Sequence, residues 1–205
     1  MEIKTIYEDN DLLVIDKPAG INCDDFKRRI HRLDKETSGV LLIAKNDNAL
    51  DFFQKQFQKR EVKKKYLALV NGHLKNKKGE IKTLLGRSPK DRRKQRVYLS
   101  YEPGAVNKRE AETRYKVLQK FENYDLIEVE PKTGRKHQIR CHFAYFGNPI
   151  AGDKLYGFKN QPCPEGLKRQ FLHANYLKIK LPNEGIREFK SELSDDLKQV
   201  LRDLI

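Results

Sequence analysis

Cysteine is scarce in this 205-residue chain, and its three copies stand far apart at Cys23, Cys141 and Cys163. An odd number of widely spaced cysteines does not fit a disulfide framework or a Cys-x-x-Cys metal site. His137 and His142 lie five residues apart, whereas two metal ligands on one helix face need a spacing of three or four. We therefore expect ordinary thiols and no metal ion.

Long apolar runs are also missing. No stretch approaches the roughly 20 apolar residues that a membrane-spanning helix needs. Met1 is not followed by a charged, then hydrophobic, then small-residue leader. Repeats and low-complexity segments are absent from the sequence too. The sequence therefore predicts a cytoplasmic protein that does not associate with membranes.

The chain has an excess of positive charge. It contains 43 Lys and Arg and 29 Asp and Glu, which gives a formal net charge of +14. Such a surface attracts a polyanion, and nucleic acid fits better than a membrane. The length suits one sizeable hydrophobic core, and no long linker divides it. We expect a single domain over residues 1–205 that acts as a monomer.

Hydrophobic patterning predicts strands with a few helices, which is an α+β fold. Strands are expected within 1–17 (two), at 40–45, 62–72, 111–117, 124–130 and 171–181. One helix is expected from Asn46 or Asp47 to about Arg60, with Leu50, Phe53 and Phe57 on its apolar face. A second helix is expected from about residue 132, with Ile139, Phe143 and Phe146 as its buried stripe. A third is expected over 194–205.

The segment from His73 to Arg96 carries ten Lys or Arg and only two acidic residues. A run of charges of one sign predicts a mobile arm that binds RNA phosphates without recognising the base sequence. Lys90, Arg92 and Arg93 are its candidate RNA-binding residues.

The most informative stretch is His-Arg-Leu-Asp-Lys-Glu-Thr-Ser-Gly at 31–39, followed by the apolar run 40–44. Taken alone, Asp34 would be expected to pair with Arg32 or Lys35 at the surface. The whole string, however, resembles the signature of the RluA family of RNA pseudouridine synthases, in which this Asp is the catalytic residue.

Four further motifs resemble that family in the same order. They are EDNDLLVIDKPAGI (8–21), KKYLALVNG (64–72), TGRKHQIR with GNPIAGDKLYG (133–140 and 147–157), and LHA (172–174). The resemblance runs from about residue 6 to 181. It implies the pseudouridine synthase fold, a long, mixed, mainly antiparallel sheet with flanking helices and loops around a central cleft. It also implies a catalytic domain without an N-terminal RNA-binding domain.

The resemblance assigns roles to individual residues. Asp34 is the expected catalytic residue, Tyr66 lies against the target base, and Arg140 pairs with Asp34. Arg32 fills the space that the extruded uridine leaves. Further RNA contacts are expected from these motif residues: His31, Thr37, Arg135, His137, Gln138 and Leu172. His173 is expected to be a structural hydrogen-bonding residue.

The implied reaction converts uridine to pseudouridine without a change of redox state, so no cofactor is expected. The expected partner is a structured RNA, either ribosomal or transfer RNA. Two other interpretations remain open at this point. A basic RNA-binding module without catalysis would explain the charge but not the placement of Asp34, Tyr66 and Arg140. A metal-dependent nuclease or deaminase would need a ligand cluster that the sequence does not offer.

Overall fold

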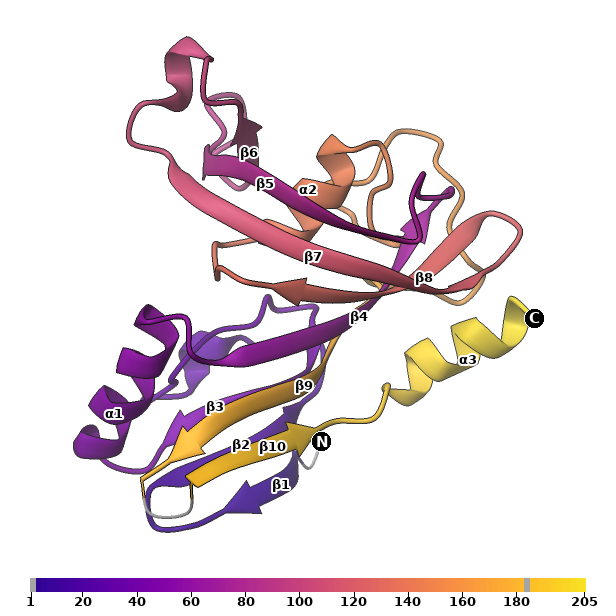
Figure 1. Cartoon of the computed structure of the whole chain (residues 1–205). Helices are drawn as coiled ribbons and strands as arrows, with labels where there is room; N and C mark the ends of the chain where they lie inside the picture. Colours follow the sequence, from indigo (N-terminus) through magenta and orange to yellow (C-terminus); the bar gives the residue numbers. More distant parts are fainter. Residues whose placement is uncertain (1–2, 183–184) are drawn as a thin grey trace. The chain divides into compact units, whose positions relative to one another are not determined.

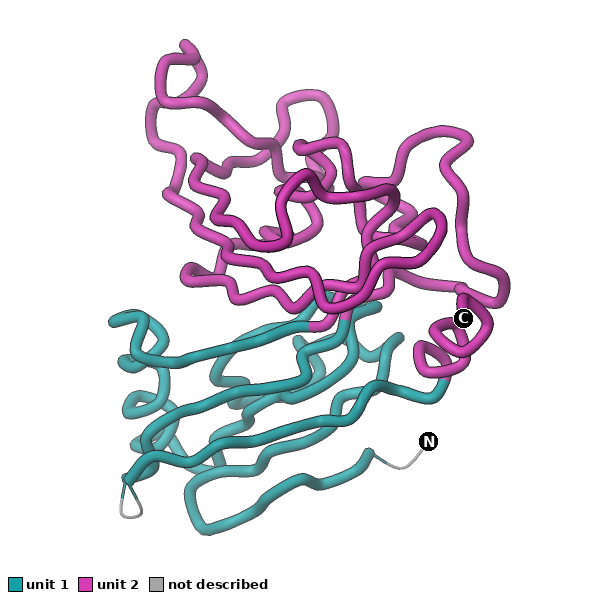
Figure 2. Tube along the Cα trace, turned by 45° about the vertical axis from the view of Figure 1, so that its right-hand side comes forward, with its two compact units in different colours: residues 1–66, 173–195 teal, residues 67–172, 196–205 magenta. Residues whose placement is uncertain are grey.

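The computed structural model describes residues 3–182 and 185–205. These residues group into two compact units, one of residues 1–66 and 173–195 and the other of residues 67–172 and 196–205 (Figure 2). The chain passes from the first unit to the second within strand β4 (Lys63–Asn71) and returns at the start of β9 (Leu172–Leu181). That all of residues 1–205 act as one catalytic domain stays a prediction.

The first unit is built on β1 (Lys4–Glu8), β2 (Leu12–Lys17), β3 (Ser38–Ala44), β9 and β10 (Gly185–Lys190) (Figure 1). Strand β2 pairs antiparallel with β1 and β3, and β10 pairs antiparallel with β9. Strand β3 joins β9 in parallel, with Ser38 opposite His173 and Gly39 opposite Ala174. This parallel junction lies directly after the Asp34 turn.

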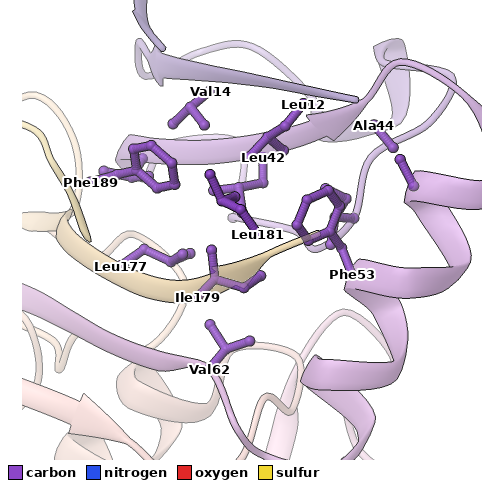
Figure 3. Close-up of a cluster of buried hydrophobic side chains, with 13 residues drawn as sticks. Leu12, Val14, Leu42, Ala44, Phe53, Val62, Leu177, Ile179, Leu181 and Phe189 are labelled. Carbon is purple, nitrogen blue, oxygen red and sulfur yellow. The ribbon is translucent and has the colours of Figure 1, made fainter. Parts of the chain in front are cut away.

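Helix α1 (Asp47–Gln58) covers one face of this unit. It begins where the Asn46 side chain accepts a hydrogen bond from the Ala49 N–H at 2.8 Å, which caps the helix as the sequence predicted. Phe53 is fully buried among Leu42, Ile179 and other apolar side chains (Figure 3). Burying each such side chain contributes about 1.5–3 kcal/mol, so this cluster is a main source of the unit's stability.

The second unit contains β5 (Lys78–Arg87), β6 (Gln95–Tyr98), β7 (Arg109–Lys120) and β8 (Tyr124–Pro131). Strand β5 pairs antiparallel with β6 and β7, and β7 pairs antiparallel with β8. Helix α2 (Gln138–Tyr145) packs against β6, β7 and β8, and α3 (Asp195–Asp203) ends the chain. In the described part of the chain, ten strands in a mixed sheet and three helices confirm the α+β fold.

Two short 3₁₀ helices complete the elements, η1 (Cys23–Asp25) before the Asp34 turn and η2 (Pro103–Ala105) between β6 and β7. The prediction of a mobile arm over residues 73–96 is wrong for half of its length, because residues 78–87 form β5 and residues 95–96 begin β6; residues 73–77 and 88–94 lie outside these strands. Ile81 and Leu85 are buried on the inward face of β5. The charged residues between them made the two-residue period of a strand difficult to recognise in the sequence. Strand β10 was missed as well.

Helix α2 begins at Gln138, about six residues later than predicted. Residues 132–137 form a bend and turn instead, and His137 has a left-handed backbone with φ of 55°. Phe146 follows the helix and is 54% exposed, so its place in the buried stripe was also predicted wrongly. Ile139 and Phe143 are buried as expected.

Candidate active site

Asp34 stands in a tight turn that leads directly into β3. The Thr37 N–H donates to the Asp34 carbonyl at 3.0 Å, which closes the turn. Leu33 and Thr37 are buried on either side, while the Asp34 side chain is half-buried. A carboxylate on a turn whose flanks are buried keeps a fixed position and stays accessible.

A fully buried lysine holds the backbone around this turn. The ammonium group of Lys17 donates to three backbone carbonyls at 2.8–3.1 Å, those of Pro18, Ile21 and Lys35. A buried cation is tolerated only where such partners satisfy it. Lys17 therefore ties the end of β2 to the residue after Asp34, a role that sequence reasoning missed although the Asp-Lys-Pro motif pointed to the position.

A buried thiol holds the other side of the turn. The Cys23 Sγ lies 3.2 Å from the Leu33 nitrogen, which donates to it, and 3.3 Å from the Leu33 carbonyl oxygen, which accepts from it. Both bonds reach the residue immediately before Asp34. The sequence had suggested only an ordinary core or near-surface thiol here.

The junction of β3 with β9 fixes the strand that the turn enters. Gly39 has φ of +114°, and a Cβ at this position would lie 2.2 Å from the Ala174 carbonyl oxygen. No other residue fits such a close approach of two backbones. Beside it, His173 is fully buried, with its Nδ1 2.9 Å from the Ser38 hydroxyl and its Nε2 3.2 Å from the Ser191 hydroxyl. The structural role predicted for His173 is confirmed.

Tyr66 lies on the part of β4 that belongs to the first unit. Its ring packs against a cluster that includes Cys23, Leu33 and Leu41. Burial raises the pKa of Tyr66 above its usual range, and the negative charge of Asp34 raises it further. The structure thus brings the Tyr66 hydroxyl, which keeps its proton at neutral pH, into the electrostatic reach of Asp34.

His31 and Arg32 precede the turn and differ in their surroundings. The His31 Nε2 accepts the Leu42 N–H at 3.2 Å, and its ring stacks on Phe57 with centroids 4.9 Å apart. Burial, together with the positive charge of Lys64, lowers the pKa of His31 to about 3, so the ring is neutral. The Arg32 side chain is exposed and makes no hydrogen bond or ion pair with any described residue.

Arg140 lies on α2 and is buried in the second unit. Its Nε and Nη2 donate to the two carboxylate oxygens of Asp153 at 2.6 and 2.8 Å. The prediction that this arginine needs a carboxylate partner is thus fulfilled by Asp153, which sequence reasoning did not single out although it lies in the GDKLYG motif. Pairing of Arg140 with Asp34 stays a prediction.

Asp153 itself is fully engaged. Its Oδ1 also accepts the N–H groups of Leu155 at 2.9 Å and Tyr156 at 3.0 Å. Burial alone would raise the pKa of Asp153, but the hydrogen bond and charge of Arg140 outweigh it and hold the pKa below its usual range. The guanidinium also lies 5.2 Å from the ring centre of Tyr156. These contacts fix the orientation of Arg140.

Gln138 anchors the first turn of α2 to the sheet. Its side-chain oxygen accepts from the Thr133 hydroxyl at 2.7 Å and the Arg135 N–H at 3.0 Å. Its amide nitrogen donates to the Glu112 carbonyl at 2.9 Å and the Thr113 hydroxyl at 3.0 Å. Gln138 is buried and satisfied by the protein, so it holds the helix that carries Arg140.

The remaining motif residues predicted to bind RNA have mixed surroundings. His137 precedes the first residue of α2 without a side-chain capping bond, and its Nδ1 lies 3.1 Å from the Tyr156 hydroxyl. Arg135 is half-buried and donates to the Glu110 carbonyl at 2.9 Å. Leu172 is buried at the start of β9. Direct RNA contact by each of them, as by His31, Thr37 and Gln138, stays a prediction.

The loop between β5 and β6 carries the three basic candidates. Lys90 and Arg92 are exposed and have no hydrogen-bonding or ionic partner among the residues that the structure describes. Arg93 instead forms two bonds with Asp91, at 3.1 and 2.9 Å. Two positive charges of this loop are therefore available to a ligand.

Residues 3–182 and 185–205 contain neither a candidate metal site nor a candidate membrane-spanning helix. No group of three or more His, Cys, Asp or Glu side chains there could hold a metal ion. None of the helices in these ranges is long and apolar enough to cross a membrane.

Comparison with known proteins identifies the class. Residues 25–145 match the family described as RNA pseudouridylate synthase. This match covers more than half of the chain and includes Asp34, Tyr66 and Arg140. The chain therefore belongs to the RNA pseudouridylate synthases, enzymes that isomerise uridine in RNA, and the resemblance to the RluA family is confirmed.

Individual relatives agree with this class. The chain is 33% identical to the uncharacterized RNA pseudouridine synthase YlyB of Bacillus subtilis, over all of this chain and 73% of that protein. It is 35% identical to ribosomal large subunit pseudouridine synthase C of Vibrio parahaemolyticus, over 98% of this chain and 69% of the relative. It is 36% identical to ribosomal large subunit pseudouridine synthase D of Nitrosomonas europaea, over 98% and 64%.

A solved structure has the same fold. Human RNA pseudouridylate synthase domain containing 4 matches with a TM-score of 0.81 and 26% identity, over 98% of this chain and 92% of that one. The predicted pseudouridine synthase fold is confirmed.

Proposed function

We propose that this enzyme acts on specific uridines of a structured RNA and that Asp34 is its catalytic carboxylate. The observation that carries the proposal is the Asp34 turn. Lys17 and Cys23 hold the backbone on the two sides of the half-buried Asp34, and the charge of Asp34 adds to burial in raising the pKa of Tyr66. In a pseudouridylate synthase, a fixed and accessible carboxylate is the group that the reaction requires.

The reaction sets the task of this carboxylate. The N1–C1′ glycosidic bond breaks, the uracil turns, and a C5–C1′ bond forms. The proton on C5 is lost and N1 gains one, so product and substrate are isomers. Asp34 would attack either C1′ of the ribose or C6 of the ring, or stabilise the charge that develops when the glycosidic bond breaks.

Tyr66 and Arg140 have supporting roles in this proposal. Tyr66 offers a flat ring to the uracil, and its raised pKa makes its hydroxyl a hydrogen-bond donor rather than a base. Arg140 binds Asp153 through its Nε and Nη2, and we propose that it also pairs with Asp34. A guanidinium near Asp34 would favour its ionised form.

RNA binding is assigned to exposed cations. The target uridine must leave its stack, and the exposed side chain of Arg32 can fill the vacated space by stacking. Lys90, Arg92 and Arg93 would contact phosphates. Arg135 would contribute from the segment before α2.

Ribosomal RNA is the first choice of substrate because two relatives are named ribosomal large subunit synthases, and transfer RNA is the second. We further propose a cytoplasmic, monomeric enzyme.

The test uses RNA labelled with tritium at C5 of uridine. Wild-type enzyme should release tritium, and Asp34→Asn should release none while binding the RNA with nearly the same affinity. Asp25→Asn is the matched control, since Asp25 is an exposed carboxylate in η1 on the same loop. Equal tritium release by Asp34→Asn and wild type would refute the assignment and favour a binding protein without catalysis.

A further inference from the structure

The connection between β6 and β7 is a folded tip rather than a loose loop (Figure 1). We define this tip as residues 99–108. Three successive turns build it, through backbone hydrogen bonds from Glu102 to Leu99, from Ala105 to Glu102 and from Lys108 to Ala105, at 2.9–3.1 Å. Ala105 is buried within it. The tip therefore presents its outward side chains in fixed directions.

The tip packs on the ring of Tyr98. Tyr98 is buried, and its hydroxyl donates to the Arg87 carbonyl at 3.1 Å. The charged groups of Arg96 and Lys108 lie 4.7 and 5.0 Å from its ring centre. A Cβ on Gly104 would lie 3.1 Å from the same ring, so η2 packs directly on it. Cation–π contacts and close packing thus stiffen the tip.

Two apolar side chains point out of this tip into solvent. Tyr101 is 80% exposed and Val106 is 73% exposed. Tyr101 makes no hydrogen bond or ring contact with the described residues. A rigid segment that exposes a free aromatic ring has the form of a stacking platform for a flat ligand.

The surrounding charges indicate an anionic ligand. Along the middle of β5 and β7, cations are neutralised by neighbours: Arg114 and Lys82 bind Glu80 at 2.7 and 2.8 Å. At the end of the sheet that carries the tip, Lys90 and Arg92 lack such partners among described residues. Tyr98, on which the tip packs, bonds to Arg87 just before the β5–β6 loop, so the unpaired cations of the loop and the tip belong to the same end of the sheet.

We propose that the tip binds an unpaired nucleotide of the RNA substrate, with its base stacked on Tyr101 and neighbouring phosphates held by the basic β5–β6 loop. This inference rests on the proposed function and adds a contact outside the Asp34 site. Bases in duplex RNA already stack on one another, so the platform would select single-stranded RNA beside the modified region.

The experiment measures binding of a short single-stranded RNA of mixed sequence and of the same RNA annealed to its complement. Tyr101→Ala should weaken binding of the single strand about 5- to 150-fold, the range that base stacking supplies. It should leave binding of the duplex unchanged. The dependence of affinity on salt should stay the same, because no charge is lost. Tyr101→Phe, which keeps the ring, should bind as wild type does.

Tyr145→Ala is the matched control, because it removes a half-exposed tyrosine from α2. It should change neither the affinity for the single strand nor the affinity for the duplex. Since Tyr101 is exposed, its variants should unfold at the wild-type temperature. Unchanged single-strand binding by Tyr101→Ala would overturn the proposal, as would an equal loss for single strand and duplex. Binding of Tyr101→Ala to intact ribosomal particles is measured as well. If Tyr101→Ala bound both RNAs as wild type does but bound these particles more weakly, the tip would be assigned to a protein partner and the proposal would be overturned. Tritium release by the wild type tests the proposed function separately.

Discussion

Replacing Asp153 with asparagine tests how strongly the buried ion pair stabilises the second unit. Asparagine keeps the shape of the side chain and one oxygen for the N–H groups of Leu155 and Tyr156. Its NH₂ group, however, faces the Arg140 Nε, which lies 2.6 Å from an acceptor oxygen in the wild type. Two donors then meet, and a guanidinium that is almost fully buried loses the negative charge of Asp153.

The expected cost follows from this geometry. Removing one partner of a buried ion pair leaves an uncompensated charge and typically costs about 3–5 kcal/mol. A domain is stable by only about 5–15 kcal/mol, so Asp153→Asn should lose a large share of its free energy of unfolding. Urea titration at neutral pH measures this loss as a lower midpoint with an unchanged slope.

The matched control is Asp91→Asn, which breaks an ion pair of the same type at the surface. Arg93 contacts both oxygens of Asp91, but its side chain is 79% exposed. Solvent screens such a pair, so the urea midpoint should hardly move. If Asp153→Asn were as stable as Asp91→Asn, the reasoning from burial would be refuted.

The pH dependence gives a second check on Asp153. Its pKa in the folded protein is lowered from the ordinary value near 3.8, so the ion pair stabilises the protein fully above that value. This stability is lost as the pH falls below about 4, through the lowered pKa. The difference in unfolding free energy between wild type and Asp153→Asn should therefore shrink in strong acid.

Further predictions concern stability and RNA binding. Gly39→Ala should cost roughly 3 kcal/mol or more, because its Cβ would meet the Ala174 carbonyl oxygen, and a urea midpoint near that of wild type would contradict this. Burial lowers the pKa of His142 to about 4, so the protein should lose stability as the pH falls from about 6.5 to 4. His142→Gln should flatten this decline in unfolding experiments at pH 7 and 5, and an equally steep decline would count against it. Changing Lys90 and Arg92 together to alanine should reduce the slope of log affinity against log salt by about 2 if each contacts a phosphate. An unchanged slope would show that they do not.

The sequence predicted the first unit, apart from β10, because the pattern of its other elements is regular. The alternation in β1, the apolar runs of β2 and β3, and the capped amphipathic helix α1 each follow from local periodicity. Strand β5 was missed because Lys78, Glu80 and Lys82 occupy its outward positions and make the segment look like a charged loop. Charge on one face of a strand is compatible with pairing, and only the long-range partner β7 reveals it.

The site was predicted as far as its motifs reach. Asp34 and Tyr66 were predicted from their motifs, and the charge of Asp34 adds to burial in raising the pKa of Tyr66. Lys17, Cys23 and Asp153 were missed because their roles depend on backbone carbonyls, a backbone N–H group and an arginine that lie elsewhere in the chain. Such buried hydrogen bonds leave no period or composition signal in a sequence.

The direct test of the account is a map of pseudouridine in the RNA of cells that carry either the wild-type protein or Asp34→Asn at equal levels. The account predicts that a defined set of uridines is modified with the wild type and unmodified with the variant. Identical maps would contradict the claim that Asp34 catalyses the reaction.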